Sequence, residues 1–396
     1  MQKAYIVSTA RTAIGTYGGS LKDIPPQKLG GTVIRAAVER AGIDSTAVEE
    51  VVFGCIGQIG IDAYMARACA LEGGLPQEST AVTVNRLCGS GLQAINQAAM
   101  SIATNQADLL IAGGVESMSR YPYLSRSTRW GAKFGPVQFD DALDEVLSCP
   151  INLYAMGCTA ENVADRWHIG REEQDRFALA SQRKAARAIN AGRFQEQIVP
   201  IEVRERRGQT RTFAIDEGPR PETTLEKLST LRPAFRDGGT VTAGNACGIN
   251  DGAAAVVVAG ENRVKALGLK PLAEVVDFAV TGVDPAIMGI GPAPAVRKLV
   301  ERTGVPLKEV GVVELNEAFA VQCLAVGREL ESLGWDWDKV NPNGGAIALG
   351  HPVGATGCIL TIKLLAEMRR LGVEYGIVTL CIGGGQGIAT LFRQVA

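Results

Sequence analysis

Short apolar runs alternate along the chain with longer stretches in which apolar residues recur every three or four positions. Residues 4–9 predict a strand, and residues 29–41 predict a helix that ends at Gly42, the residue type that most often follows a last helical turn. Residues 51–54 predict the next strand. This alternation is typical of an α/β protein whose strands are mostly parallel.

The same order of elements occurs twice. In each copy a turn of small residues precedes a helix with one apolar face, and the strand that follows this helix ends at glycines. In the first copy, the strand 82–84 leads to the turn at Cys88, which is followed by the helix 92–102 and the strand 109–112. In the second copy, the turn 351–357 is followed by the helix 359–368 and the strand 377–380. The duplication places polar residues just past the carboxyl ends of strands in both halves, where open α/β sheets bind ligands.

The region between the two copies, from about residue 117 to 241, is polar and rich in arginine. It contains a long helical stretch, residues 171–191, that is closed by Gly192. Thr159 has the pattern of a helix N-cap, with Glu161 in the first turn. We interpret the region as an insertion that serves as a lid or an oligomerisation element; a solvated surface subdomain is the alternative.

Composition sets limits on function. With 396 residues, 46% of them hydrophobic, the chain is long enough for two or three domains around a large core. Its net charge of -2 provides no overall field that would hold nucleic acid or an anionic membrane, and no apolar run approaches the roughly 20 residues of a membrane helix. The chain begins directly with a strand pattern and without a signal-peptide core, so we expect a cytoplasmic protein with no nucleic-acid or membrane partner.

The nine cysteines are scattered singly and form no Cys-x-x-Cys pair. This pattern indicates neither a zinc site nor a disulfide framework, and it fits a reducing cytosol. We therefore predict no metal site and expect most of these cysteines to be small buried hydrophobic residues.

Cys88 is the first candidate for chemistry. It lies in residues 84–91 (VNRLCGSG), where an apolar run breaks into small residues at the start of a helix. The free N–H groups of a helix N-terminus favour the nucleophilic thiolate, and they can hold an oxyanion formed on an attacked carbonyl. The alternative for an isolated cysteine is a buried structural thiol.

A thiol nucleophile needs a base, and the chain has two histidines. His168 lies in a polar helical stretch, whereas His351 follows a glycine-rich run and precedes a proline. We therefore predict His351 as the base for Cys88. Its alternative is a loop histidine that caps local backbone groups.

Two further candidates follow strand patterns. Cys381 precedes Ile382 and three glycines, and a second thiol in the site makes sense as an acid and base, since its unperturbed pKa of about 8.5 allows proton exchange near neutral pH. The alternative is a disulfide partner for Cys88. Asn316 follows the strand 312–315, where its amide could orient a water or donate to an oxyanion; taken alone, a helix N-cap explains it as well.

Together these motifs resemble the thiolase family, the acetyl-CoA acetyltransferases and 3-ketoacyl-CoA thiolases. The resemblance spans essentially the whole chain and rests on residues 85–91, 113–119, 156–163, 239–245, 250–253, 316–320, 343–357 and 381–387. It implies an α/β protein with the duplicated five-layer αβαβα fold and an inserted loop domain. The implied domains are an N-terminal half, residues 1–117 completed by 248–270, a loop domain for CoA binding and oligomerisation, residues 118–247, and a C-terminal half, residues 271–396.

The resemblance also implies a ping-pong Claisen condensation of two acyl-CoA molecules, reversible as thiolysis. In this reaction Cys88 takes the acyl group, His351 activates it and Cys381 moves the α-proton. Asn316, through a water, and His351 form one oxyanion hole, and the N–H groups of Cys88 and Gly383 form the other. Losing one such donor typically costs roughly 3 kcal/mol.

The resemblance extends to the substrate site. Arg220 matches a position that lies against the adenine of CoA, and the pantetheine and acyl pockets are matched by Met156, Phe235, Ala243, Met288, Ala318 and Phe319. For the apolar residues the alternative is ordinary core. CoA thioesters are the substrates and partners, and no separate cofactor is implied.

Of the departures from the family pattern, Cys358 and Ile359 replace a frequent Ala-Arg pair and affect helix packing, whereas two others affect the substrate site. Cys247 stands where relatives usually have a serine that contacts the pantetheine, and a thiol is a weaker hydrogen-bonding group. Ala155 stands where many short-chain biosynthetic members have histidine, which widens the space near the acyl group. The departure at Cys247 affects the CoA contacts, and the one at Ala155 weakens strict acetoacetyl specificity.

The sequence therefore predicts a cytosolic acetyl-CoA C-acetyltransferase that forms a homodimer or homotetramer. The alternative is a 3-ketoacyl-CoA thiolase with broader chain length. A ketoacyl synthase acting on carrier-protein thioesters is less compatible with Cys381, and a papain-like cysteine hydrolase is less compatible with the duplicated pattern. A binding protein of the same fold without catalysis is the least compatible, because every chemical position is filled.

Overall fold

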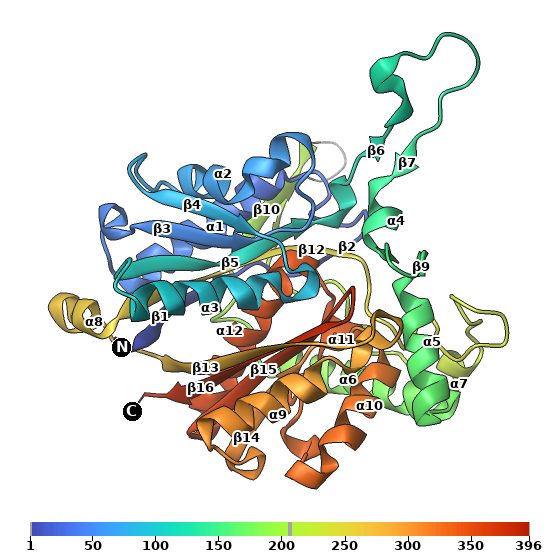
Figure 1. Ribbon diagram of the computed structural model, residues 1–396. Helices are drawn as coiled ribbons and strands as arrows, with labels where there is room; N and C mark the ends of the chain where they lie inside the picture. The colour runs from blue at the N-terminus through green and yellow to red at the C-terminus, as the bar shows by residue number, and fades with distance from the viewer. Residues whose placement is uncertain (1, 205–207, 396) are drawn as a thin grey trace.

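The computed structural model describes residues 2–204 and 208–395 (Figure 1). A ten-stranded sheet runs through the molecule in the order β14-β15-β16-β13-β1-β12-β5-β3-β4, with β2 beside β12. Its strands are β1 (Ala4–Arg11), β2 (Gly15–Thr16), β3 (Glu50–Gly54), β4 (Thr80–Val84), β5 (Leu109–Ser117), β12 (Asn250–Gly260), β13 (Ala273–Gly282), β14 (Val310–Leu315), β15 (Tyr375–Ile382) and β16 (Gln386–Gln394).

The sheet consists of two halves with one topology. In the first half, the strands lie side by side in the order β4-β3-β5-β12-β1. With β2 left aside, these are the third, second, fourth, fifth and first strands of that half along the chain. The second half repeats this order in β14-β15-β16-β13, and a single bridge from Val340 to Val313 takes the place of β4. The halves join where β1 and β13 pair through Tyr5–Glu274 and Ile6–Ala273. The duplication predicted from the sequence is confirmed.

Helices occupy three layers around the two half-sheets (Figure 1). One outer layer holds α1 (Pro26–Ala41) and α2 (Met65–Glu72), and the other holds α9 (Pro292–Thr303) and α10 (Ala320–Leu330). The middle layer holds α3 (Ser90–Ala103) and α12 (Val353–Leu371), which pack against each other and against both half-sheets. This arrangement is the expected αβαβα succession of five layers.

Glycines allow close approach in the middle layer. A Cβ on Gly114 would lie 2.1 Å from the carbonyl oxygen of Gly354, and a Cβ on Gly91 would lie 2.9 Å from that oxygen. Real Cβ atoms do not approach so closely, so α12 can approach β5 and α3 only because these residues are glycine. The N-termini of α3 and α12, which follow Cys88 and His351, are thereby brought together.

The expectation of mostly parallel strands is wrong. Parallel pairing occurs for β3 with β4, β3 with β5, and β14 with β15, whereas the other neighbours in the main sheet pair antiparallel. The last strand of each half runs antiparallel to the main-sheet strand before it, and in the second half a short turn joins β15 to β16. A buried apolar strand has the same sequence pattern in either direction, so the pattern did not reveal this.

In the first half, residues 118–249 connect β5 to β12. The equivalent connection in the second half, between β15 and β16, is a short turn. The long segment 118–249 carries an arm that projects from the body of the molecule (Figure 1). Its elements are β6 (Tyr123–Leu124), β7 (Asp140–Asp141), α4 (Ala142–Val146), β8 (Ser148–Cys149), β9 (Tyr154–Ala155), α5 (Met156–Trp167), α6 (Arg171–Asn190), β10 (Ile201–Arg204), β11 (Thr210–Phe213) and α7 (Leu225–Ser229). Two short helices elsewhere are α8 (Glu261–Leu267) and α11 (Ala346–Leu349).

Helix ends agree with the sequence in part. Helix α1 ends before Gly42, which has a φ of 65°, and α6 is followed by Gly192 with a φ of 68°, as predicted. Thr159, however, is not an N-cap: α5 begins at Met156, and the buried Thr159 hydroxyl donates to the Met156 carbonyl at 2.6 Å. Threonine makes such bonds within a first turn as readily as it caps, so the prediction misplaced the helix start.

All nine cysteines are free, and six of them are buried. Within residues 2–204 and 208–395, no three His, Cys, Asp or Glu side chains lie together in a way that could hold a metal ion. None of the helices in this part of the chain is both long and apolar enough to cross a membrane.

Candidate active site

The turn between β4 and α3 presents Cys88. Leu87, the residue before it, has a left-handed φ of 45°, which is unusual for a side chain that is not glycine. The Asn85 side chain accepts from the Leu87 N–H at 3.1 Å, and the Ser90 hydroxyl donates to the Leu87 carbonyl at 2.7 Å. These contacts hold a tight turn that leaves the partly exposed Cys88 at the head of α3.

The turn after β15 lies over Cys88. The backbone N–H of Gly383 forms a hydrogen bond to the Cys88 sulfur. A Cβ on Gly89 would lie 2.7 Å from the Ile382 side chain, and a Cβ on Gly383 would lie 2.8 Å from the methyl of Met156. The thiol of one half is therefore in contact with the backbone donor of the other.

His351 is held at three points. Its backbone N–H donates to Asn250 Oδ1 at 2.8 Å, its ring Nδ1 lies 2.7 Å from Thr356 Oγ1, and its ring Nε2 lies 3.4 Å from Asn316 Nδ2. The residue is 4% exposed. The ring orientation is thus determined by an alcohol on one nitrogen and an amide on the other.

The protonation states of this pair follow from burial. Burial raises the pKa of Cys88 to about 11, although the N–H groups of Gly383 and Cys88 itself lower it. Burial lowers the pKa of His351 to about 4. The N–H groups thus favour the thiolate, as expected at the start of a helix, but desolvation of the charged sulfur outweighs them. At neutral pH the free protein therefore holds Cys88 as a thiol and His351 as a neutral imidazole.

Cys381 and Cys247 lie near enough to Cys88 to interact electrostatically with it. Burial raises the pKa of Cys381 well above its usual value, and negative charge on Cys88 and then on Cys247 raises it further. Burial, followed by charge on Cys88, raises the pKa of Cys247 to about 12. All three are free thiols, so the alternative of a disulfide between Cys88 and Cys381 is not what the structure has.

Asn316 follows β14 directly and is fully buried. The alternative of a helix N-cap is wrong, since α10 starts at Ala320 and has Phe319 at its N-cap position. Its Nδ2 faces His351, while its Oδ1 has no hydrogen-bond partner in the described structure. An unpaired buried oxygen is costly, so this amide is suited to hold a bound water or substrate group.

The apolar residues predicted for the acyl pocket lie together. The rings of Phe235 and Phe319 meet edge to face at 6.1 Å. Met288, Ala318 and Phe319 are buried in one apolar cluster that also contains Cys381, and Met156 and Phe235 pack against it. These side chains are core residues, and the core they form borders the thiol.

A cavity of about 530 Å³ leads up to the site. Arg220 and Ala243 line it, and so do Ala246 and Gly350, the chain neighbours of Cys247 and His351. Lys227 also lines this cavity, although the sequence analysis did not single it out. Lys227 was hard to recognise from the sequence, because a lysine on a short polar helix usually contacts only solvent.

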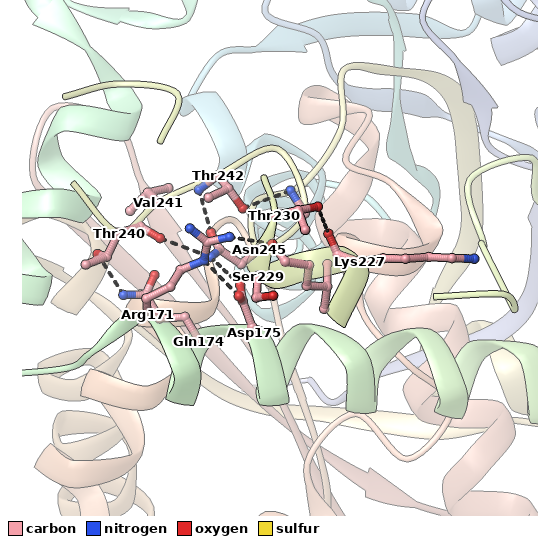
Figure 2. A network of polar contacts seen from close by, with 12 residues as sticks. Arg171, Gln174, Asp175, Lys227, Ser229, Thr230, Thr240, Val241, Thr242 and Asn245 are labelled. Atoms are coloured by element: carbon pink, nitrogen blue, oxygen red, sulfur yellow. Dashed lines mark hydrogen bonds and ion pairs between the residues drawn. The ribbon is translucent and has the colours of Figure 1, made fainter. Parts of the chain in front are cut away.

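The segment that carries Ala243 and Cys247 is fastened to α6. Figure 2 shows the polar network: Asn245 Nδ2 donates to Asp175 Oδ1 at 2.9 Å, and Arg171 Nε donates to the other oxygen of Asp175 at 2.8 Å. Gln174 Nε2 donates to Thr240 Oγ1 at 2.9 Å. The Cys247 N–H then donates to the Ala318 carbonyl, which ties the end of this segment to the strand-following loop of the second half.

Sequence reasoning missed several residues that support the site. Thr356 and Asn250 hold His351, and they lie in the segments 343–357 and 250–253 on which the family resemblance rests, which was a usable signal. Glu116, 1% exposed, accepts from the N–H groups of Ile56, Gly57 and Gly354, and thereby ties the His351 helix to the Cys88 half. A buried carboxylate with such partners looks like any other glutamate in sequence.

Comparison with known proteins extends these observations. A model described as the thiolase N-terminal domain matches residues 4–262, and one described as the thiolase C-terminal domain matches residues 269–394. An acetyl-CoA acetyltransferase of Pseudomonas aeruginosa is 48% identical over 396 residues, covering 100% of both chains. The beta-ketothiolase BktB of Cupriavidus necator is also 48% identical, again with 100% of both chains covered.

Solved structures give the same result. The Bacillus anthracis acetyl-CoA acetyltransferase superposes with a TM-score of 0.96 at 46% identity, covering 100% of this chain and 99% of that one. The human mitochondrial 3-ketoacyl-CoA thiolase in complex with CoA superposes with a TM-score of 0.94 at 44% identity, covering 100% and 98%. With two family models spanning nearly all of its length and relatives that match it end to end, this chain belongs to the thiolase family.

Proposed function

We propose that this protein is an acetyl-CoA C-acetyltransferase that condenses two acetyl-CoA molecules to acetoacetyl-CoA and CoA, and that runs in reverse as the thiolysis of short 3-ketoacyl-CoA. The observation that carries the proposal is the meeting of Cys88 with the Gly383 N–H, close to Cys381, at the seam between the two halves. Full-length relatives named acetyl-CoA acetyltransferase support the assignment.

In the first half-reaction, the Cys88 sulfur attacks the thioester carbonyl of acetyl-CoA and CoA leaves as its thiol. Since the resting thiol has a pKa of about 11, its proton must move to His351 as the C–S bond forms rather than before. The N–H groups of Cys88 and Gly383 are the donors that receive the carbonyl oxygen. His351 then returns the proton to the departing CoA sulfur.

In the second half-reaction, His351 takes the proton of the Cys381 thiol, because burial raises the pKa of Cys381 and leaves it protonated at rest. The resulting Cys381 thiolate removes an α-proton from the second acetyl-CoA. Asn316, through a water, and the protonated His351 hold the enolate oxygen. The enolate carbon then attacks the acetyl-cysteine, and Cys88 leaves as a thiolate that takes the proton back from His351.

The CoA moiety is proposed to occupy the 530 Å³ cavity. Arg220 lies against the adenine, Lys227 supplies positive charge for the phosphates, and Ala243 lies along the path that the pantetheine takes toward Cys88. Cys247 gives this path a thiol in place of a hydroxyl, which weakens one hydrogen bond to the pantetheine. Met156, Phe235, Met288, Ala318 and Phe319 enclose the acyl group.

The alternative of a 3-ketoacyl-CoA thiolase with broader chain length rests on Ala155, at the start of α5 beside Met156. A small side chain there leaves room for additional methylenes. The solved 3-ketoacyl-CoA thiolase that superposes on this chain keeps the alternative open.

Steady-state thiolysis across 3-ketoacyl-CoA substrates of increasing length tests the proposal. We expect the highest kcat/KM with acetoacetyl-CoA and a decline of about tenfold or more by eight carbons, since each methylene in a restricted pocket changes binding by about 1–3 kcal/mol. A flat profile would support the broader thiolase instead. Activity with acyl-carrier protein as the acyl donor and none with acyl-CoA would support a ketoacyl synthase and contradict both.

We also propose a cytoplasmic homodimer or homotetramer in which residues 118–247 act as the inserted domain. Strand β4 is an edge strand with partly exposed residues, which leaves its outer backbone groups free to pair with a second copy. The arm between β6 and β7 carries exposed aromatic side chains, with Trp130 90% and Phe139 59% exposed. Such apolar side chains mark a contact surface.

Deletion of the arm tip, residues 125–138, tests the second contact. We expect a tetramer to become a dimer in light scattering while acetyl transfer per subunit stays within about twofold, since the arm lies away from Cys88. Replacing Val82 by lysine, a charge on the β4 edge, is the matched change at the other contact and should shift the dimer toward monomer. An unchanged mass in both variants would contradict this assignment of surfaces.

A further inference from the structure

The ring of His351 is held by a threonine one turn into the helix that follows it. Nδ1 lies 2.7 Å from Thr356 Oγ1, and the Thr356 hydroxyl donates to the carbonyl of Pro352 at 2.8 Å. His351 precedes α12, Pro352 is its N-cap residue and Thr356 lies in its first turn, where it is 2% exposed. The imidazole, the hydroxyl and the carbonyl therefore form a buried chain of hydrogen bonds.

The direction of this chain follows from counting protons. A hydroxyl has one proton to donate, and when that proton points to Pro352 the oxygen presents a lone pair to Nδ1. Nδ1 must then carry the ring hydrogen. The opposite nitrogen agrees, because the Asn316 amide places its NH2 group 3.4 Å from Nε2, where a donor requires a lone pair.

The groups that bond to the two ring nitrogens are neutral, so their hydrogen bonds determine the tautomer. In the described structure, the partners of the two ring nitrogens are an alcohol and an amide, not the carboxylate that orients histidine in many triads. Burial keeps the ring neutral, so one nitrogen holds the hydrogen and the other is the base. With the hydrogen on Nδ1, the nitrogen with the free lone pair is Nε2, which faces the Asn316 amide.

We propose that Thr356 is a positioning residue that fixes His351 as the Nδ1–H tautomer and so leaves Nε2 as the base for Cys88. The inference rests on the proposed function for its catalytic consequence. The tautomer itself exists in the free enzyme and is measured without substrate, so a wrong substrate assignment and a wrong role for Thr356 give different results.

The first test is solid-state NMR of enzyme labelled with 15N in histidine. The chain has two histidines, His168 and His351, so the spectrum contains two rings. We expect His351 of the wild type to show a protonated Nδ1 and an unprotonated Nε2. Thr356→Val, which keeps the shape but removes the acceptor, should shift His351 to the Nε2–H form or to a mixture, while the signals of His168 stay unchanged.

The second test is kinetic. Thr356→Val should lower kcat by about 100-fold and leave the KM for acetyl-CoA within about twofold, because it removes a correctly protonated base and no substrate contact. Alkylation of Cys88 by iodoacetamide at neutral pH should slow in parallel, since it needs the same proton transfer. Thr356→Ser keeps the hydroxyl and should recover most of the wild-type rate.

Thr361→Val is the matched control. Thr361 is a fully buried threonine on the same helix whose hydroxyl donates to the Gly357 carbonyl four residues earlier, as Thr356 does to Pro352. It does not contact His351, so its loss should leave kcat and the histidine spectrum unchanged. If Thr361→Val lowers kcat as much as Thr356→Val does, the effect is one of helix packing and the proposal is overturned.

Two further results would overturn it. One is a protonated Nε2 on His351 in the wild type, a measurement that needs no variant and stands even if Thr356→Val fails to fold. The other is a folded Thr356→Val that keeps both the Nδ1–H signal and wild-type kcat.

Discussion

Replacement of Cys88 by serine should lower acetyl transfer by at least about 10⁴-fold, the loss that follows removal of a catalytic nucleophile. A hydroxyl is much harder to deprotonate than a thiol, and His351, the proposed base, has a pKa of only about 4. The measurement is the exchange of labelled CoA into acetyl-CoA, which reports the first half-reaction alone. Mass spectrometry of the wild type mixed with acetyl-CoA should show one acetyl group, located on Cys88.

Cys69→Ala is the matched control for this variant. Cys69 is a fully buried free thiol on the outer helix α2, so its loss changes packing but no group of the site. Exchange should remain within about twofold of the wild type. Retention of exchange in Cys88→Ser, or acetylation of another cysteine in the wild type, would contradict the assignment of the nucleophile.

Replacement of Cys381 by alanine should separate the two half-reactions. Exchange of CoA into acetyl-CoA should persist within about fivefold, because Cys88, His351 and the Gly383 N–H remain. Condensation should fall by about 10³-fold, since general acid and base groups contribute about 10²–10⁴. The measurement compares exchange with acetoacetyl-CoA formation in one preparation.

The outcome distinguishes three roles for this thiol. Loss of both reactions would make Cys381 part of the acylation step or of the fold, and wild-type condensation would exclude it as the α-proton base. Cys381→Ser is a useful companion, because serine keeps the size of the side chain while raising the pKa further. Its condensation rate should also be strongly reduced, whereas its thermal stability should match the wild type more closely than that of the alanine variant.

Much of the fold was readable from the sequence because it depends on periodicity. The strands, the middle-layer helices and the repeated order of elements all follow from apolar spacing, which burial enforces. Strand direction was not readable, since β12 and β16 are buried on both faces and a two-sided apolar run looks the same in either orientation. The start of α5 was misplaced by a few residues because Thr159 bonds within the turn instead of capping it.

The same distinction between local sequence patterns and tertiary contacts applies to the candidate site. Gly383 follows β15 directly, and Cys381 lies near the end of that strand. Cys88 follows β4 after a short turn, and His351 follows α11 in a glycine-rich run. Their local sequence indicated their positions, and their catalytic roles are proposals. The ionisation of Cys88 was not predictable, since it depends on how deeply the second half covers the thiol. Asn250 and Lys227 were missed because their contribution depends on residues far away in the sequence, and Thr356 was missed because its contact with His351 depends on how the chain turns into α12.

The two halves differ at one connection, and the difference has a consequence for how such a protein can change over evolution. In the C-terminal copy the last two strands are linked by a few glycines whose backbone faces the nucleophile, so any lengthening there would displace a donor from the reacting carbonyl. In the N-terminal copy the matching link has absorbed more than a hundred residues without disturbing either strand. One connection is thus constrained by the proposed chemistry, whereas its counterpart was free to lengthen and to carry the proposed surfaces for CoA and for neighbouring subunits.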